Sequence, residues 1–150
     1  MKPIVLASTS RWRLQLLTDA GITAEAIDPD VDEPTIVGNG PIETARVRAI
    51  AKASTVGSMR TEALVIGADQ VIHLDGETIG KPSDLDEWRQ RLVAMRGRDH
   101  QLTTAVALHE AGEVEAFETT TVVRFRADLT DAEINRYIRH GEARGCAGGY

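Results

Sequence analysis

Short, unbroken apolar runs restrict the fold of this chain more than any other feature. Ile4-Val5-Leu6-Ala7 and Ala63-Leu64-Val65-Ile66-Gly67-Ala68 are continuous, without the alternation of a strand that has one side in solvent. Runs of this kind are typical of strands buried on both faces, which occur in sheets covered by helices. They predict an α/β protein with a mixed sheet.

The segments between these runs predict four helices and further strands in the order β-α-β-α-β-β-α-β-β-α. Residues 28–40 contain two prolines and two glycines and are expected to form an acidic loop. With 150 residues, we expect a single domain over residues 1–150. The helices are predicted at residues 11–20, 41–56, 83–95 and 130–140, and strands at 4–7, 23–27, 63–68, 100–109 and 114–126. Residues 71–74 continue extended after the third of these strands, and Asp75-Gly76 is expected to form a hairpin turn.

Composition excludes several classes of function. The chain has 23 acidic and 17 basic residues, which gives a net charge of −6 at pH 7. This charge argues against a general nucleic-acid binder but not against a small phosphorylated ligand held by local cations. Cys146 is the single cysteine, so neither an internal disulfide nor a four-cysteine zinc site is expected. No apolar run approaches a membrane span, so we expect no membrane partner and a cytoplasmic location.

The turn after the first strand, Ser8-Thr9-Ser10, has the chemistry of a helix N-terminus that binds anions. Arg11 and Arg13 follow it and could bind phosphate oxygens. Helix capping with solvated arginines is the commoner role of such a turn. Trp12 could stack on a base or pack against the neighbouring strand. The residues of this turn do not by themselves decide between these alternatives.

Carboxylates occur at two positions that could carry chemistry. Asp28, Asp30, Asp32 and Glu33 cluster in the acidic loop, where they could hold Mg²⁺ or Mn²⁺ or could simply be solvated. Asp69 leaves a buried strand, where open α/β sheets place their ligands. It could act as a general base or could be the Asp of a β-turn.

Two lysines complete the set. Lys81 is fixed between Gly80 and Pro82, and the proline favours extended backbone at the lysine. Lys52 lies in a predicted helix between two alanines, where it could face a pocket, although solvated helix lysines are commoner. Carboxylates for a metal, cations for phosphates and a stacking ring together favour metal-dependent attack on a nucleotide phosphate.

The motifs resemble, in order along the whole chain, those of the Maf family of nucleoside triphosphate pyrophosphatases. The residues that carry this resemblance are Leu6 to Ser10 with Arg13, Asp32-Glu33, Arg48, Lys52-Ala53, Gly67 to Val71, Gly80-Lys81-Pro82, Gly97 with His100, Thr104, Tyr137, and Ala147-Gly148 with Tyr150.

The resemblance implies a Maf/ITPase-like fold, a mixed twisted sheet flanked by helices with an active-site cleft. It implies hydrolysis of the α–β phosphoanhydride of a nucleoside triphosphate, with a divalent cation (Mg²⁺ or Mn²⁺) as cofactor. Asp69 would be the proton acceptor, and Glu33 and Asp69 the metal ligands. The implied phosphate contacts are Ser8, Arg13, Lys52 and Lys81. A nucleotide is the implied partner, and a homodimer is left open.

Trp12 and Gln70 resemble the branch of the family that hydrolyses 7-methyl-GTP. Methylation at N7 makes guanine cationic, so stacking on Trp12 gains a cation–π component of roughly 0.5–2 kcal/mol. Gln70 offers a donor and an acceptor to a purine edge. Members specific for dTTP and UTP usually have Arg and Thr at these two positions. The alternatives are a dTTP/UTP pyrophosphatase of the same family and a nucleotide-binding regulator of septum formation without turnover.

Three departures from the family pattern stand out. Arg11 and Ala143 occupy positions where the family usually has proline. The chain stops at Tyr150, whereas family members typically continue, so we expect it to lack the usual C-terminal segment. That segment would contain a third residue linked to base choice, in addition to Trp12 and Gln70. An inactive relative is therefore a further alternative. The tail from Gly145 to Tyr150 is expected either to be frayed or to be part of a glycine-rich active-site turn.

Overall fold

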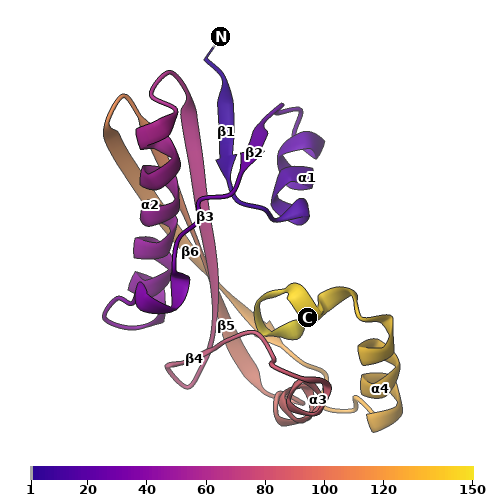
Figure 1. Cartoon of the computed structure of the whole chain (residues 1–150). Helices are drawn as coiled ribbons and strands as arrows, with labels where there is room; N and C mark the ends of the chain where they lie inside the picture. Colours follow the sequence, from indigo (N-terminus) through magenta and orange to yellow (C-terminus); the bar gives the residue numbers. More distant parts are fainter. Residues whose placement is uncertain (1) are drawn as a thin grey trace. The chain divides into compact units, whose positions relative to one another are not determined.

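The computed structural model describes residues 2–150 and confirms the α/β class and the predicted order of elements. Four helices and six strands follow one another as expected (Figure 1), joined in places by short 3₁₀ turns. The strands are β1 (Ile4–Ala7), β2 (Glu25–Ile27), β3 (Leu64–Leu74), β4 (Glu77–Ile79), β5 (Asp99–Glu110) and β6 (Glu113–Arg124), and the helices are α1 (Arg11–Asp19), α2 (Pro41–Met59), α3 (Leu85–Ala94) and α4 (Asp131–His140).

The chain forms two compact units. The first contains the residues up to Asp69 together with Thr104–Thr119, and the second contains Gln70–Thr103 and Thr120–Tyr150. Nowhere in residues 2–150 is there a helix both long and apolar enough to cross a membrane.

The sheet has the strand order β2-β1-β3-β5-β6, with β4 paired to β3. In the first unit, β1 runs parallel to both of its neighbours, so Ala7 lies opposite Ile27 on one side and opposite Gly67 on the other. Parallel strands end at the same edge of a sheet, the edge at which α/β proteins bind ligands. Ser8, which follows β1, and Asp69, which lies within β3 two residues beyond Gly67, are therefore both at the end of this parallel pairing.

Helix α2 packs against β1 and β3 through small residues. Ala45, Ala49 and Ala53 on α2 are fully buried. A Cβ atom built on Gly67 of β3 would lie 2.6 Å from the Ala53 amide nitrogen, so no other residue fits there without moving the helix. The helix therefore lies directly on the strand backbone (Figure 1). This close approach brings Lys52, the neighbour of Ala53, to the end of the β1-paired part of β3.

The second unit has its own core around Trp88 of α3 and Ile134 of α4, and it includes the end of the chain. Gly148 and Gly149 are buried, and the Trp88 indole N–H donates to the Gly149 carbonyl at 2.6 Å. Of the two alternatives for the tail, a frayed end is therefore wrong, and a role as an active-site turn stays a prediction. Both glycines have positive φ and touch apolar side chains, so their lack of a Cβ is what allows this packing.

We expect Gly67→Ala to destabilise the protein by about 1–3 kcal/mol, because the added methyl group forces α2 away from β3. Gly145→Ala is the matched control, since a Cβ there meets no atom within 4 Å and the backbone φ is not positive. Urea unfolding followed by circular dichroism measures both. Equal stability of the two variants would contradict the packing described for α2.

Candidate active site

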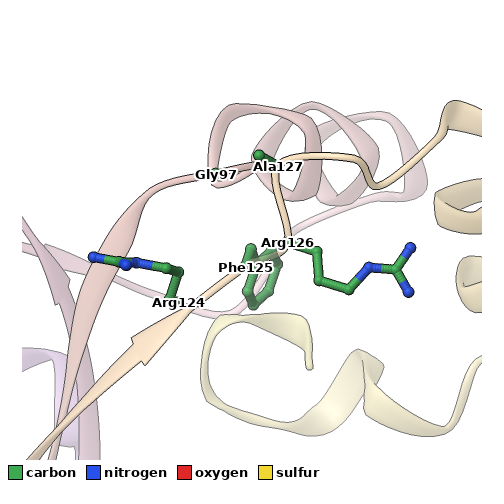
Figure 2. A pocket seen from close by; sticks show the side chains of 5 residues that line it. All are labelled: Gly97, Arg124, Phe125, Arg126 and Ala127. Carbon is green, nitrogen blue, oxygen red and sulfur yellow. The ribbon is translucent and has the colours of Figure 1, made fainter.

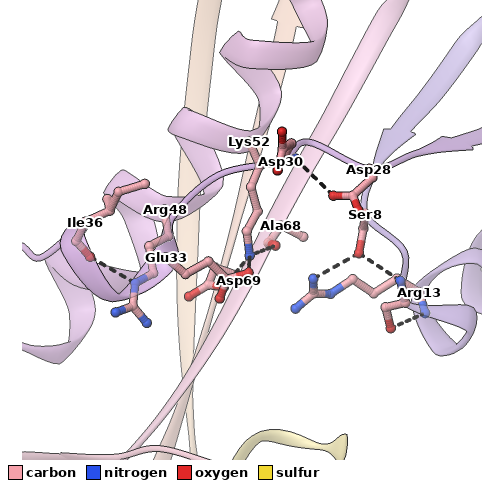
Figure 3. Close-up of polar contacts among 11 residues, drawn as sticks. Ser8, Arg13, Asp28, Asp30, Glu33, Ile36, Arg48, Lys52, Ala68 and Asp69 are labelled. Carbon is pink, nitrogen blue, oxygen red and sulfur yellow. Dashed lines mark hydrogen bonds and ion pairs between the residues drawn. The ribbon is translucent and has the colours of Figure 1, made fainter.

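A buried ion-pair cluster lies where the pairing of β3 with β1 ends, entirely within the first unit (Figure 3). Asp69 lies within β3, which continues to Leu74, so the predictions that it leaves the strand or forms a β-turn are wrong. The Lys52 Nζ atom is 2.7 Å from Asp69 Oδ1 and 2.9 Å from Glu33 Oε1. The lysine and aspartate side chains are 4% and 6% exposed, whereas that of Glu33 is 47% exposed. The expectation that a lysine in this helix is more often solvated is wrong for Lys52, because α2 lies too close to the sheet to leave it in water.

The ammonium group of Lys52 has three protons to donate. Beyond the two carboxylates, its remaining neighbour is the Ala68 carbonyl oxygen at 3.5 Å. An unpaired ammonium in this position would carry a large desolvation cost, so the two carboxylates stabilise it. One lysine with two carboxylates leaves the cluster with a net charge of −1, which attracts cations.

The two oxygens of Asp69 are in different environments. Oδ1 accepts the Lys52 bond, whereas Oδ2 is buried and has no hydrogen-bond partner within the described residues. Leaving a buried acceptor unsatisfied costs free energy, and such atoms call for an explanation in terms of catalysis or an absent ion. Oδ2 is therefore an atom of this cluster that can accept a proton or bind a cation.

Ser8 anchors the turn between β1 and α1. Its Oγ atom accepts bonds from the Ser10 amide at 3.1 Å and from the Arg13 guanidinium at 3.3 Å. Ser10 caps α1 by accepting the Arg13 amide, so the capping interpretation of this turn is confirmed. The structure brings Ser8 and Arg13 together, and their contact with phosphate stays a prediction.

Trp12 is half exposed on the first turn of α1, so it is not a core residue packed against the sheet. The Arg11 guanidinium lies 4.4 Å from the centroid of its ring. One side of the indole therefore already carries a cation–π contact.

The acidic loop contributes Glu33 to the cluster, whereas the Asp28 carboxylate accepts the amide of Asp30 within the loop. Residues 2–150 contain no group of three or more His, Cys, Asp or Glu side chains arranged to hold a metal ion. Magnesium commonly binds through one or two carboxylates together with phosphates of the substrate. Glu33 and Asp69, whose Oδ2 atom has no hydrogen-bond partner in the described residues, fit a cation of that kind.

Two predicted site residues belong to the second unit. Gln70 and Lys81 are both exposed, the former in β3 directly after Asp69 and the latter in the segment after β4. Their contacts with the nucleotide stay predictions.

A cavity of about 420 Å³ in the second unit is a separate feature (Figure 2). Its lining has two arginines, but Arg124 is ion-paired with Asp99, and Arg126 with Asp128 and Glu133. A phosphate would have to compete with these carboxylates. The full lining is Gly97, Arg124, Phe125, Arg126 and Ala127, which includes none of the predicted site residues.

Arg48 is among the motif residues of the resemblance, but sequence analysis assigned it no role in the site. Its Nε atom donates to the Ile36 carbonyl at 2.9 Å, across the loop that carries Glu33 (Figure 3). The signal in the sequence is its position one helical turn before Lys52, on the same side of α2.

The fold and the cluster define a mixed-sheet α/β protein with a site of two carboxylates and one lysine where the parallel pairing of β1 with β3 ends. The fold is similar to that of the Staphylococcus aureus Ham1 protein, with a TM-score of 0.60 and 19% identity over 84% of this chain and 73% of that one. The Vibrio cholerae protein VC0702 also resembles it, with a TM-score of 0.50 and 11% identity over 97% of this chain and 81% of that one.

The chain belongs to the Maf family, because the family model described as Maf-like protein matches residues 3–150. A Bordetella pertussis relative named 7-methyl-GTP pyrophosphatase is 39% identical, over 97% of this chain and 72% of that protein. A Pelotomaculum thermopropionicum relative named dTTP/UTP pyrophosphatase is 42% identical, over 100% of this chain and 79% of that protein. The resemblance inferred from the motifs is therefore confirmed.

We expect Lys52→Met to destabilise the protein by about 3–5 kcal/mol, because it leaves the buried Asp69 carboxylate without its counter-charge. Adding Asp69→Asn to that variant should restore much of the loss. The free energies of unfolding of the two single variants and the double variant, from urea titrations at pH 7, measure this coupling. Additive losses would show that the pair contributes nothing as a pair.

Proposed function

We propose that this chain hydrolyses the α–β phosphoanhydride of a nucleoside triphosphate to a nucleoside monophosphate and pyrophosphate. The observation that carries the proposal is the buried Asp69 carboxylate, with one oxygen held by Lys52 and the other without a hydrogen-bond partner. Membership of the Maf family and two relatives named as pyrophosphatases support the same reaction.

In this proposal Asp69 Oδ2 accepts a proton from a water molecule, whose oxygen forms a bond to the α-phosphorus. The bond from that phosphorus to the bridging oxygen breaks, and pyrophosphate leaves. Lys52 holds Asp69 Oδ1, which fixes the carboxylate and keeps Oδ2 as its basic oxygen. A direct contact of Lys52 with phosphate stays a prediction, since its ammonium protons already face protein oxygens.

Binding a triphosphate requires local positive charge, because the chain carries a net charge of −6. A divalent cation, Mg²⁺ or Mn²⁺, held by Glu33 and Asp69 would neutralise phosphate charge and polarise the anhydride. Ser8 and Arg13, joined at the first turn of α1, would contact phosphate oxygens. Lys81 would supply a further cation.

For the base, we propose 7-methyl-guanine. The half-exposed indole of Trp12 offers a ring on which a cationic purine could stack, as the Arg11 guanidinium already does. Gln70 would bind the purine edge. Hydrolysis of dTTP or UTP is the second candidate, and the relative with that name and 42% identity favours it.

Four further features stay predictions. The cytoplasmic location and the single domain over residues 1–150 were inferred from composition and length, whereas a homodimer and a link to septum formation are implied by the resemblance. A nucleotide-binding regulator without turnover would not require a buried carboxylate oxygen that has no hydrogen-bond partner, beside a second carboxylate.

We expect Asp69→Asn to lower the rate of pyrophosphate release by roughly 10²–10⁴-fold, because an amide cannot act as the base. Asp75→Asn is the matched control: this exposed residue in the turn after β3 has a positive φ that asparagine also adopts. Pyrophosphate release with Mg²⁺ or Mn²⁺ measures both. Near-normal turnover by the Asp69 variant would remove that residue from the mechanism.

The choice of base is tested by Trp12→Arg combined with Gln70→Thr. The double variant should lower kcat/KM for 7-methyl-GTP and raise it for dTTP and UTP, with about tenfold from loss of the ring stack alone. GTP is the control substrate, since it differs from 7-methyl-GTP by the N7 methyl group and its charge. A wild-type preference for dTTP or UTP would contradict the assignment of the base and leave the pyrophosphatase reaction standing.

A further inference from the structure

The loop that carries Glu33 is held by polar contacts rather than by a core. Between residues 30 and 40 the structure has no buried side chain, and Val37 is 69% exposed. A segment without buried apolar side chains opens readily unless hydrogen bonds fix it. The position of the Glu33 carboxylate therefore depends on the bonds that tie this segment to α2.

Those bonds are made by two successive turns of α2. At the first turn of the helix, Thr44 accepts the Gly38 amide at 3.0 Å and Glu43 accepts the Asn39 amide at 2.6 Å. These bonds hold the end of the loop. Arg48, one turn further along, donates Nε to the Ile36 carbonyl at 2.9 Å.

The bond from Arg48 is made to Ile36, directly after the 3₁₀ turn that carries Glu33. Ile36 ends the 3₁₀ turn Glu33–Thr35, and its own amide donates to the Glu33 carbonyl at 3.1 Å. Arg48 therefore holds one end of this turn, and Glu33 at the other end reaches Lys52. Arg48 and Lys52 are four residues apart on one face of α2, so both contacts of the turn are made to the same rigid element.

We propose that Arg48 is a positioning residue for the reaction: it fixes the Glu33 turn so that the Glu33 carboxylate stays beside Asp69 and Lys52. This role rests on the proposed function of the site. Arg48 acts through Glu33, so its loss weakens the use of the divalent cation and lowers turnover while the sheet and α2 stay folded.

A double-mutant cycle tests the dependence on Glu33. Arg48→Ala should lower kcat/KM by about tenfold and raise the Mg²⁺ concentration for half-maximal activity. In a Glu33→Gln background the same change should cost less than about twofold. Arg48→Lys should recover most of the loss, because an ammonium can donate to the same carbonyl. Arg46→Ala is the matched control, since Arg46 lies on the same helix but pairs with Glu118 on β6. A tenfold loss in both backgrounds, or none in either, would overturn the proposal.

Amide hydrogen exchange measured by mass spectrometry tests the same idea without any activity. Arg48→Ala should speed exchange in peptides that cover residues 30–40 and leave peptides from β1 unchanged, and Arg46→Ala should change neither. Unchanged exchange in residues 30–40 would overturn the positioning role. If the wild-type chain released no pyrophosphate, the proposed function would fail, and the exchange result would still decide the role of Arg48 in holding the loop.

Discussion

The close approach of α2 to β3 is the constraint on which the site depends. Gly67 has no side chain, and the facing positions of the helix are alanines, so the helix rests on the strand backbone. Lys52 lies on the side of α2 that faces the sheet, so its side chain is buried and its ammonium group is stabilised by carboxylate partners. Asp69 supplies one partner from β3 and Glu33 supplies the other from the loop. Packing thus places the Lys52 ammonium between two carboxylates where the pairing of β1 with β3 ends.

Much of the fold is predictable from the sequence because its elements follow local rules. The buried strands have unbroken apolar runs, and the caps at Ser10 and Thr130 have the expected chemistry and bonds. The capping box at Thr130 also holds the pKa of Glu133 down at about 2, since the Thr130 backbone amide and hydroxyl donate to the carboxylate. The docked glycine tail was not predictable, because its packing depends on the shape of the distant Trp88 side chain.

The site was predictable in its membership but not in its internal contacts. Local patterns and family motifs named Asp69, Glu33 and Lys52, yet treated the lysine as a phosphate contact or a solvated residue. Lys52 is buried because α2 lies close to β3. That distance depends on the contact between Gly67 and Ala53, which the sequence does not show. The family motifs also included Arg48, but its bond is to the backbone carbonyl of Ile36, and the sequence does not show which carbonyl an arginine will reach. Gln70 and Lys81 were named by motif and lie in the second unit.

The central claim is that this site directs a water molecule to the α-phosphorus of a nucleoside triphosphate, with pyrophosphate as the leaving group. Hydrolysis of 7-methyl-GTP and of dTTP by the purified chain in water enriched in oxygen-18, with products analysed by phosphorus NMR, tests it most directly. The account predicts a labelled nucleoside monophosphate and unlabelled pyrophosphate. Label in the pyrophosphate, or release of orthophosphate with a nucleoside diphosphate, would contradict it.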